Sequence, residues 1–278
     1  MIILDGKKIK NEILDELKNE VSELTEKPNF VVIQVGDNPA SNVYIKQKAK
    51  MAEYVGYGYK HLKLAEDITE KDLLNEIDIL NKDKNVHGIL VQMPLPEQID
   101  ANKVQNAVLP EKDVDGLCDM NAGKLFHNKD ALFSCTPYGV MEILKRYNIS
   151  IEGRHAVIVG RSNLVGKPMS VMLTNAGATV TLCHSKTKDL MMHTKMADIL
   201  IVCVGKPKMI TSEMVSEGTI VIDVGINRLA DGLCGDVDYE NVANKCSYIT
   251  PVPGGVGPMT VAMLGQNVLK AYQMQKEK

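Results

Sequence analysis

The sequence predicts an α/β fold with two domains, each built on a parallel β-sheet. Short runs of apolar, β-branched residues alternate with amphipathic stretches along nearly the whole chain of 278 residues. Several runs are apolar at consecutive positions, which is typical of strands that are buried on both faces of a parallel sheet. Parallel strands of this kind are joined by right-handed helical crossovers.

Strand-like and helix-like segments follow one another in a regular order. The expected strands are residues 29–36, 59–65, 86–95, 155–160, 178–185, 198–205 and 218–226. The expected helices include residues 7–25, 39–55, 69–82, 137–148, 166–176 and 258–273. The segment 111–126 interrupts the alternation and is rich in turn-forming residues, so we expect a domain boundary near residue 120. The predicted domains are residues 1–120 and 121–258, and a C-terminal helix at about 259–278 is expected to pack back on the first domain, which leaves a cleft between the two.

Composition excludes several classes of protein. The net charge is -3, aromatic residues make up 4% of the chain and tryptophan is absent, so nucleic acid is not an expected partner. No apolar stretch reaches the ~20 residues that a membrane span needs, and the charged N-terminus does not have the pattern of a signal peptide. Six cysteines without CxxC spacing predict free thiols in a reducing cytoplasm, and six dispersed histidines give no support for a metal site.

A loop with two glycines follows the expected strand 155–160 and reads VGRSNLVGKPMS. It is not a P-loop, because five residues separate Gly160 from Gly166. It also departs from the GxGxxG pattern, because Ser162 stands where that pattern has a glycine. The free N–H groups at the start of the next helix still suit a phosphate, and Arg161 and Ser162 add hydrogen-bond donors. The alternative is that the two glycines serve only a tight turn and close helix–strand packing.

The end of the next expected strand indicates which dinucleotide this loop would bind. A site for NAD usually has an acidic residue about 20 residues after the glycines, where it accepts hydrogen bonds from the ribose. The segment 183–187 reads CHSKT and has a cation and two hydroxyls but no acid. With Arg161 nearby, this predicts a pocket for a 2′-phosphate, and so NADP, with either Ser185 or Lys186 as the contact.

Tyr44 and Lys48 are the first candidates for chemistry. They lie four positions apart in an expected helix, so their side chains share one face. A phenol in a shared hydrogen-bond network, together with partial removal from water, can lower the pKa of a lysine toward the range useful for acid–base catalysis. The alternative is a solvated helix face, since Lys46, Lys48 and Lys50 cannot all point inward.

Three segment ends supply further candidates. Gln92 ends an apolar strand, where its side chain would either face a ligand at the carboxyl edge of the sheet or cap that edge. Asp113 is expected to cap a turn, whereas Asp115 either points into the cleft or also serves the turn. The loop 250–260 has three glycines and three prolines, which suits a flat ligand lying against backbone, or simply turns the chain.

These motifs together resemble one protein family. YIKQK, VQMPLP, KDVDG, CTPYG, GRSNLVGKPMS with CHSKT, and PVPGGVGPMT follow one another along essentially the whole chain. In this order they resemble the bifunctional methylenetetrahydrofolate dehydrogenase/methenyltetrahydrofolate cyclohydrolase family, also called FolD. The resemblance implies that residues 1–120 form a folate-binding catalytic domain and 121–258 a Rossmann-like NADP-binding domain. It also implies a homodimer formed through the second domain.

The resemblance implies two successive reactions. NADP takes a hydride from 5,10-methylenetetrahydrofolate, and water then opens the resulting 5,10-methenyl cation to 10-formyltetrahydrofolate. Hydride transfer needs mainly positioning, whereas the hydrolysis needs proton transfers, for which Lys48 is the candidate. By analogy with the family, Lys48 is polarised by Gln92 and aligned by Tyr44. Asp115 would accept two hydrogen bonds from the edge of the pterin.

The resemblance implies further contacts on both the folate and the cofactor side. The folate pocket would be lined by Pro253, Gly254 and Gly255. The cofactor site would include Gly160, Arg161 and Ser162 at the pyrophosphate and ribose, Ser185 near the 2′-phosphate, and Ile226 near the nicotinamide end.

Three other functions fit parts of the sequence. A monofunctional, NAD-dependent methylene-folate dehydrogenase would not need the basic CHSKT segment. An amino-acid or shikimate dehydrogenase with the same two-domain plan would leave PVPGGVGPMT without an explanation. A non-catalytic nucleotide-sensing module would leave the polar residues of the first domain without a role.

Overall fold

The computed structural model describes residues 1–230 and 232–276, which group into two compact units. The six-stranded unit contains Met1–Asn11 and Thr136–Thr260, and the three-stranded unit contains Glu12–Cys135 and residues 261–276. The sequence placed a boundary near residue 120, whereas the contacts divide the chain between Cys135 and Thr136.

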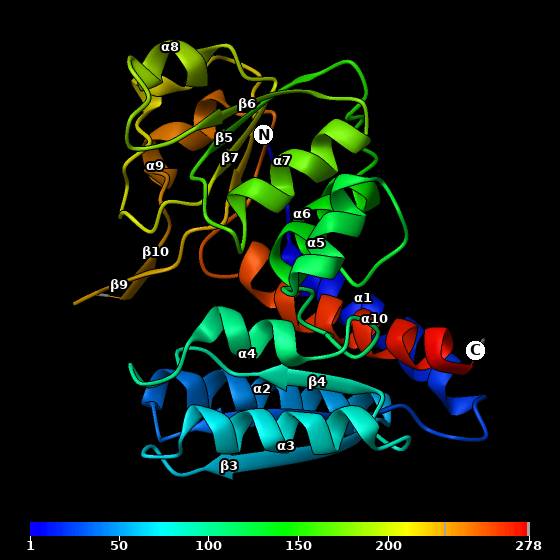
Figure 1. Cartoon of the computed structure of the whole chain (residues 1–278). Coiled ribbons are helices and arrows are strands. Elements are labelled where there is room, and N and C mark those ends of the chain that lie inside the picture. Colours follow the sequence, from blue (N-terminus) through cyan, green and yellow to red (C-terminus); the bar gives the residue numbers. More distant parts are fainter. Residues whose placement is uncertain (231, 277–278) are drawn as a thin grey trace. The chain divides into compact units, whose positions relative to one another are not determined.

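The three-stranded unit is built on a parallel sheet in the order β3-β2-β4 (Figure 1). Its strands are β2 (Asn29–Val35), β3 (Gly58–Leu64) and β4 (Gly88–Val91). Central strand β2 is buried along nearly its whole length, as its unbroken apolar run predicts. Because side chains alternate along a strand, Val31 and Ile33 share one face, where they pack with Leu73 and Ile77 of α3 (Glu70–Lys82).

The opposite face of this sheet carries an aromatic cluster. The ring of Phe30 lies edge-on to Tyr57, with their centroids 6.5 Å apart, and edge-on to Tyr59 at 5.3 Å. Tyr57 follows α2 (Pro39–Val55), and its hydroxyl donates to the carbonyl of Gly265 over 2.9 Å. The C-terminal part of α10 (Val256–Lys276) therefore belongs to this unit.

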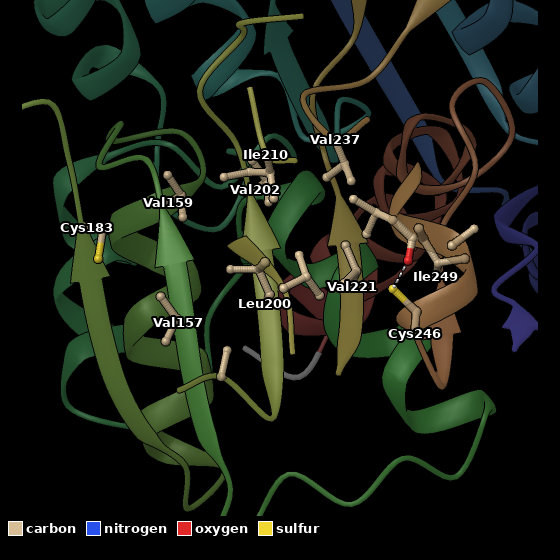
Figure 2. Close-up of a cluster of buried hydrophobic side chains, with 14 residues drawn as sticks. Val157, Val159, Cys183, Leu200, Val202, Ile210, Val221, Val237, Cys246 and Ile249 are labelled. Carbon is tan, nitrogen blue, oxygen red and sulfur yellow. Dashed lines mark hydrogen bonds between the residues drawn. The ribbon is translucent and has the colours of Figure 1, made fainter. Parts of the chain in front are cut away.

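The six-stranded unit is built on a second parallel sheet, in the order β1-β11-β8-β7-β5-β6. Its strands are β1 (Ile2–Ile3), β5 (His155–Val159), β6 (Thr179–Cys183), β7 (Ile199–Val202), β8 (Ile220–Asp223) and β11 (Tyr248–Ile249). Strand β1 pairs with β11 at one edge, which is why the first residues of the chain belong to this unit. Figure 2 shows the apolar cluster on one face of the sheet, where Val157, Leu200 and Val221 from three neighbouring strands lie side by side.

The remaining elements are mostly short. The helices are α1 (Gly6–Ser22), α4 (Ala101–Ala107), α5 (Asp119–Phe126), α6 (Cys135–Arg146), α7 (Gly166–Asn175), α8 (Leu190–Lys195) and α9 (Tyr239–Val242). Two 3-10 turns, η1 (Ser212–Met214) and η2 (Ala243–Lys245), and a hairpin of β9 (Asn227–Leu229) and β10 (Gly232–Cys234) complete the described chain. Helix α7 packs along β5 and β6 (Figure 1).

The predicted fold class is confirmed, because both main sheets are parallel and helices connect their strands. All seven predicted strands are present in the structure, whereas β1, β11 and the hairpin were not predicted. These unpredicted strands have two or three residues each, too few to show a periodic pattern.

Within residues 1–230 and 232–276, no helix combines the length and apolar character needed to cross a membrane.

A buried lysine closes the end of α3. Lys112 is 5% exposed, and its Nζ donates to the carbonyl oxygens of Leu80 at 3.1 Å, Asn81 at 2.8 Å and Asp83 at 2.7 Å. The last carbonyl groups of a helix have no partners within the helix, so this ammonium satisfies acceptors that would otherwise be buried without a donor.

We predict that Lys112→Met lowers the free energy of unfolding by about 2–3 kcal/mol, because a charged donor to buried carbonyls is lost. Urea unfolding followed by circular dichroism measures the change. Lys82→Met, in the last turn of the same helix, removes an exposed ion pair with Asp78 and should cost less than about 0.5 kcal/mol. Equal losses in the two variants would contradict the capping role.

Candidate active site

A lysine and a glutamine meet at the carboxyl edge of the three-stranded sheet. Lys48 projects from α2, and its Nζ donates to Oε1 of Gln92 over 2.8 Å. Gln92 directly follows β4, and its backbone N–H continues the sheet by donating to the carbonyl of Ile33 over 2.8 Å. Its Nε2 donates to the carbonyl of Met93 over 2.7 Å. This second bond orients the amide so that its oxygen faces the lysine.

Burial and a nearby carboxylate shift the pKa of Lys48 in opposite directions. Its removal from water lowers the pKa of the ammonium below the usual value, while the negative charge of Asp115 raises it. Burial likewise raises the pKa of Asp115, and the positive charge of Lys48 lowers it. The lowered pKa of Lys48 therefore comes mainly from burial, and not from the tyrosine hydroxyl that the sequence suggested.

The positions of the other α2 candidates explain why only one lysine is involved. Lys46 and Lys50 are exposed, whereas Lys48 is half-buried. Tyr44 lies one turn before Lys48 and is 44% exposed. Tyr44 is thus on the helix face of Lys48, with much of its side chain accessible to solvent.

Cys135 is a neighbour of this site that the sequence analysis did not select. Its buried thiol hydrogen-bonds to the carboxylate of Asp115. Burial and the charge of Asp115 raise the pKa of this thiol well above its usual value, so it remains a neutral donor. The only sequence signal was its place in the CTPYG motif, because a cysteine among apolar residues otherwise indicates core packing.

Asp113 shapes the turn that presents Asp115. Its Oδ1 accepts from the N–H of Gly116 over 3.0 Å, and its Oδ2 accepts from the N–H of Cys118 over 2.8 Å. Gly116 has a φ of +69°, and a Cβ there would lie 2.2 Å from the carbonyl carbon of Phe133. The prediction that Asp113 caps a turn is confirmed.

A buried asparagine holds the same turn from the C-terminal helix. Nδ2 of Asn267 donates to the carbonyls of Val114 at 2.9 Å and Phe133 at 2.8 Å. Asn267 is 1% exposed. This role could not be predicted from the sequence, because the partners of Asn267 are backbone carbonyls far away along the chain.

A second group of predicted residues lies in the six-stranded unit, around the end of β5. The N–H of Gly160 donates to the carbonyl of Cys183 over 2.9 Å, which joins the ends of β5 and β6. Gly160 has a φ of +123°. A Cβ on Gly166 would lie 1.9 Å from the carbonyl oxygen of Gly160. The close helix–strand packing, which the sequence left open as the alternative interpretation of these glycines, is therefore present. The same contact brings the start of α7 to the strand end, where Arg161 and Ser162 are exposed.

The turn after β6 exposes a serine and a lysine. The N–H of His184 donates to Oγ1 of Thr187 over 2.8 Å, and the N–H of Lys186 donates to Nδ1 of His184 over 3.1 Å. These bonds use the polar groups of His184 and Thr187 within the turn. Ser185 and Lys186 are left exposed beside the end of β6.

Ile226 and the loop at 250–255 are further predicted residues of the same unit. Ile226 is 48% exposed, although it is a large apolar side chain. Gly254 has a φ of +111°, and a Cβ on Gly6 would lie 1.9 Å from the carbonyl oxygen of Gly255. The bare backbone of this loop thus lies directly against the start of α1, and Pro253 is exposed.

Among the residues that the structure describes, no three or more histidine, cysteine, aspartate or glutamate side chains form a group able to hold a metal ion. The six cysteines are free thiols, and Cys118, Cys135, Cys183 and Cys246 are buried.

Both halves of the chain match one protein family. The catalytic domain of tetrahydrofolate dehydrogenase/cyclohydrolase matches residues 4–115, and the NAD(P)-binding domain of the same enzyme matches residues 134–276. The chain belongs to this family. The resemblance inferred from the motifs is thereby confirmed, together with the predicted enzyme class and a domain for a nicotinamide dinucleotide.

Individual relatives are similar over their whole length. The bifunctional protein FolD of Nautilia profundicola is 55% identical over 276 residues, which cover 98% of this chain and 97% of the relative. The crystal structure of the bifunctional FolD of Campylobacter jejuni is 50% identical, with a TM-score of 0.97 and 99% of both chains covered. The Trypanosoma brucei FolD, solved with NADP and an inhibitor, is 33% identical, with a TM-score of 0.95 and coverage of 100% and 99%.

We predict that Asp115→Asn lowers the pKa of Lys48 further, because the negative charge that stabilises the ammonium is removed while its burial is retained. At a fixed pH, a larger fraction of Lys48 is then neutral and reacts with acetic anhydride. The measurement is the pH dependence of Lys48 acetylation, followed by peptide mass spectrometry. The acetylation of exposed Lys46 should not respond to the substitution. A Lys48 profile displaced to higher pH would contradict this electrostatic account.

Proposed function

We propose that this chain oxidises 5,10-methylenetetrahydrofolate with NADP and hydrolyses the 5,10-methenyl product to 10-formyltetrahydrofolate. The observation that carries the proposal is the hydrogen bond from Lys48 to Gln92 beside Asp115, in the part of the chain that matches the family's catalytic domain. This cluster provides a proton-transfer group with a lowered pKa and a carboxylate next to it.

In the hydrolysis, Lys48 acts as the general base. The oxygen of water bonds to the methenyl carbon, and one of its protons passes to the neutral Nζ of Lys48. The hydroxyl of this intermediate then gives up its remaining proton and becomes the formyl C=O, the bond between that carbon and N5 breaks, and N5 takes up a proton, which leaves the formyl group on N10. The lowered pKa of Lys48 supports this role, because a larger fraction of the side chain is unprotonated than for an exposed lysine.

Gln92, Asp115 and Tyr44 orient the reacting groups. The bond from Lys48 to Oε1 of Gln92 holds the nitrogen in one position, and the amide is itself fixed by Met93. The carboxylate of Asp115 accepts hydrogen bonds from the N–H groups on the pterin edge. The exposed ring of Tyr44, one helical turn from Lys48, contacts the folate. In the six-stranded unit, the loop of Pro253, Gly254 and Gly255 offers bare backbone against which a flat ligand such as folate can lie.

The six-stranded unit holds the cofactor. The start of α7 can lie against the end of β5 because Gly166 has no Cβ, which would lie 1.9 Å from the carbonyl oxygen of Gly160. A helix that begins beside a strand end in this way commonly binds a phosphate. Arg161 and Ser162 are exposed there to contact the pyrophosphate and ribose, and Ile226 contacts the nicotinamide end. When bound, NADP accepts the hydride from the methylene carbon of the folate.

The turn after β6 favours NADP over NAD. Ser185 and Lys186 are exposed, while no acidic residue lies between Cys183 and Thr187 to accept from the ribose hydroxyls.

The family resemblance further supports a homodimer formed through the six-stranded unit and a cytoplasmic location.

We predict that Lys48→Met reduces the hydrolysis of 5,10-methenyltetrahydrofolate by at least about a hundredfold, because the general base is lost. The decrease in absorbance of the methenyl cation measures the rate. Lys46→Met removes an exposed lysine from the same helix and should retain the parental rate. Undiminished hydrolysis in Lys48→Met would reject the assignment.

We predict that the double substitution of Ser185→Ala and Lys186→Ala raises KM for NADP by about ten- to hundredfold, because charge-assisted contacts to the 2′-phosphate are lost. KM for NAD, which has no 2′-phosphate, should change much less. Initial rates with methylenetetrahydrofolate and each cofactor provide the comparison. An equal rise for both cofactors would mean that the 2′-phosphate binds elsewhere.

A further inference from the structure

Two aspartates that have no role in the sites described above are buried in the six-stranded unit. Asp223, the last residue of β8, is 3% exposed, and Asp236 is completely buried. A buried carboxylate is costly unless donors surround it, so its partners indicate what it does.

The carboxylate of Asp236 binds the backbone of the loop that follows β7. Its Oδ2 accepts from the N–H groups of Val204 at 2.7 Å and Gly205 at 2.9 Å, and its Oδ1 accepts from the N–H of Lys206 at 2.8 Å. Three successive N–H groups around one anion form the kind of concavity that binds phosphate in other proteins. Here the anion belongs to the protein, so the concavity holds the loop in one conformation.

The same carboxylate also holds the segment that follows β8. Oδ1 of Asp236 accepts from Nδ2 of Asn227 over 2.9 Å. Asn227 is next to Ile226, the exposed residue assigned to the nicotinamide end. A Cβ on Gly225 would lie 2.1 Å from Cγ of Asp236, so the close approach of this segment requires glycine.

The loop after β7 is in turn the support for Gly160. The N–H of Cys203 donates to the carbonyl of Val159 over 2.8 Å, and a Cβ on Gly160 would lie 2.4 Å from the carbonyl oxygen of Cys203. There is no free space between these two backbones. A displacement of residues 203–206 would therefore displace Gly160, the first residue of the loop 160–166 that is proposed to bind the pyrophosphate.

Asp236 is itself anchored to the sheet. Its N–H donates to Oδ1 of Asp223 over 3.0 Å, and the N–H of Val237 donates to Oδ2 of the same carboxylate over 2.8 Å. The side chain of Val237 points into the apolar cluster near Ile210 and Val202 (Figure 2). The carboxylate thus connects a fixed point of the core to two loops at the carboxyl ends of β7 and β8, the edge at which open α/β sheets bind ligands.

We propose that Asp236 is a positioning residue for the dinucleotide, which sets the loops after β7 and β8 against the pyrophosphate and nicotinamide ends of NADP. This inference rests on the proposed cofactor site and adds a residue that does not touch the cofactor. Asparagine cannot replace it, because each carboxylate oxygen accepts two N–H groups and an amide nitrogen in either place would face two donors.

The test separates cofactor binding from folate chemistry in Asp236→Asn. We expect KM for NADP, and the Kd for NADPH measured by nicotinamide fluorescence, to rise at least tenfold. Hydrolysis of added 5,10-methenyltetrahydrofolate, which uses no NADP, should stay within about twofold of the parent. The matched control is Asp238→Asn, which removes the same charge from a carboxylate that accepts from Asn241. It should leave all three quantities unchanged.

Asn227→Ala provides a milder second variant, because it removes one donor and leaves residues 204–206 bound to the carboxylate. Its rise in Kd should lie between those of Asp238→Asn and Asp236→Asn. An unchanged Kd in both Asp236→Asn and Asn227→Ala would overturn the inference, as would a parallel loss of NADPH binding and hydrolysis in Asp236→Asn. If the parent protein bound NADPH without either catalytic activity, the proposed function would fail while the Kd values still tested Asp236.

Discussion

The bond between the ammonium of Lys48 and the amide oxygen of Gln92 is the interaction on which the proposed chemistry depends. A half-buried lysine with no acceptor would be costly, and one paired tightly with a carboxylate would keep its proton. A neutral acceptor satisfies the ammonium without adding a full negative charge. The remaining charge, on Asp115, opposes the effect of burial without removing it. This balance suits a group that must both accept and release a proton.

Two buried carboxylates support the two groups of site residues in the same physical way. Asp113 accepts N–H groups of the turn that presents Asp115, and Asp236 accepts N–H groups of the loop beneath Gly160. In both places a glycine that cannot accommodate a Cβ allows the backbone to come close. A short, buried anion can bind several N–H groups at once, which orders an irregular segment that has no sheet or helix to order it.

Local pattern was enough to predict the architecture and the polar ends of strands. The apolar runs located β2, β4, β5, β7 and β8, and Gln92 could be assigned to a sheet edge because it directly follows one of them. Pairings between distant segments leave no such pattern, so β1 and β11 were missed. Cys135, Asn267 and Asp236 were missed for the same reason. Their partners are far away in the sequence or are backbone groups, which no residue type reveals.

The loop at Gly160 shows why two interpretations of a motif need not compete. The sequence allowed either a phosphate-binding loop or a packing device, and the structure establishes that both glycines are required by packing. That packing is also compatible with a phosphate site, because it brings the start of α7 to the end of β5. Here Gly160 makes close backbone contacts with Gly166 and Cys203, although five residues separate the two glycines, a spacing that neither the P-loop nor the GxGxxG pattern has. The constraint is the distance between backbones, and several glycine spacings can satisfy it.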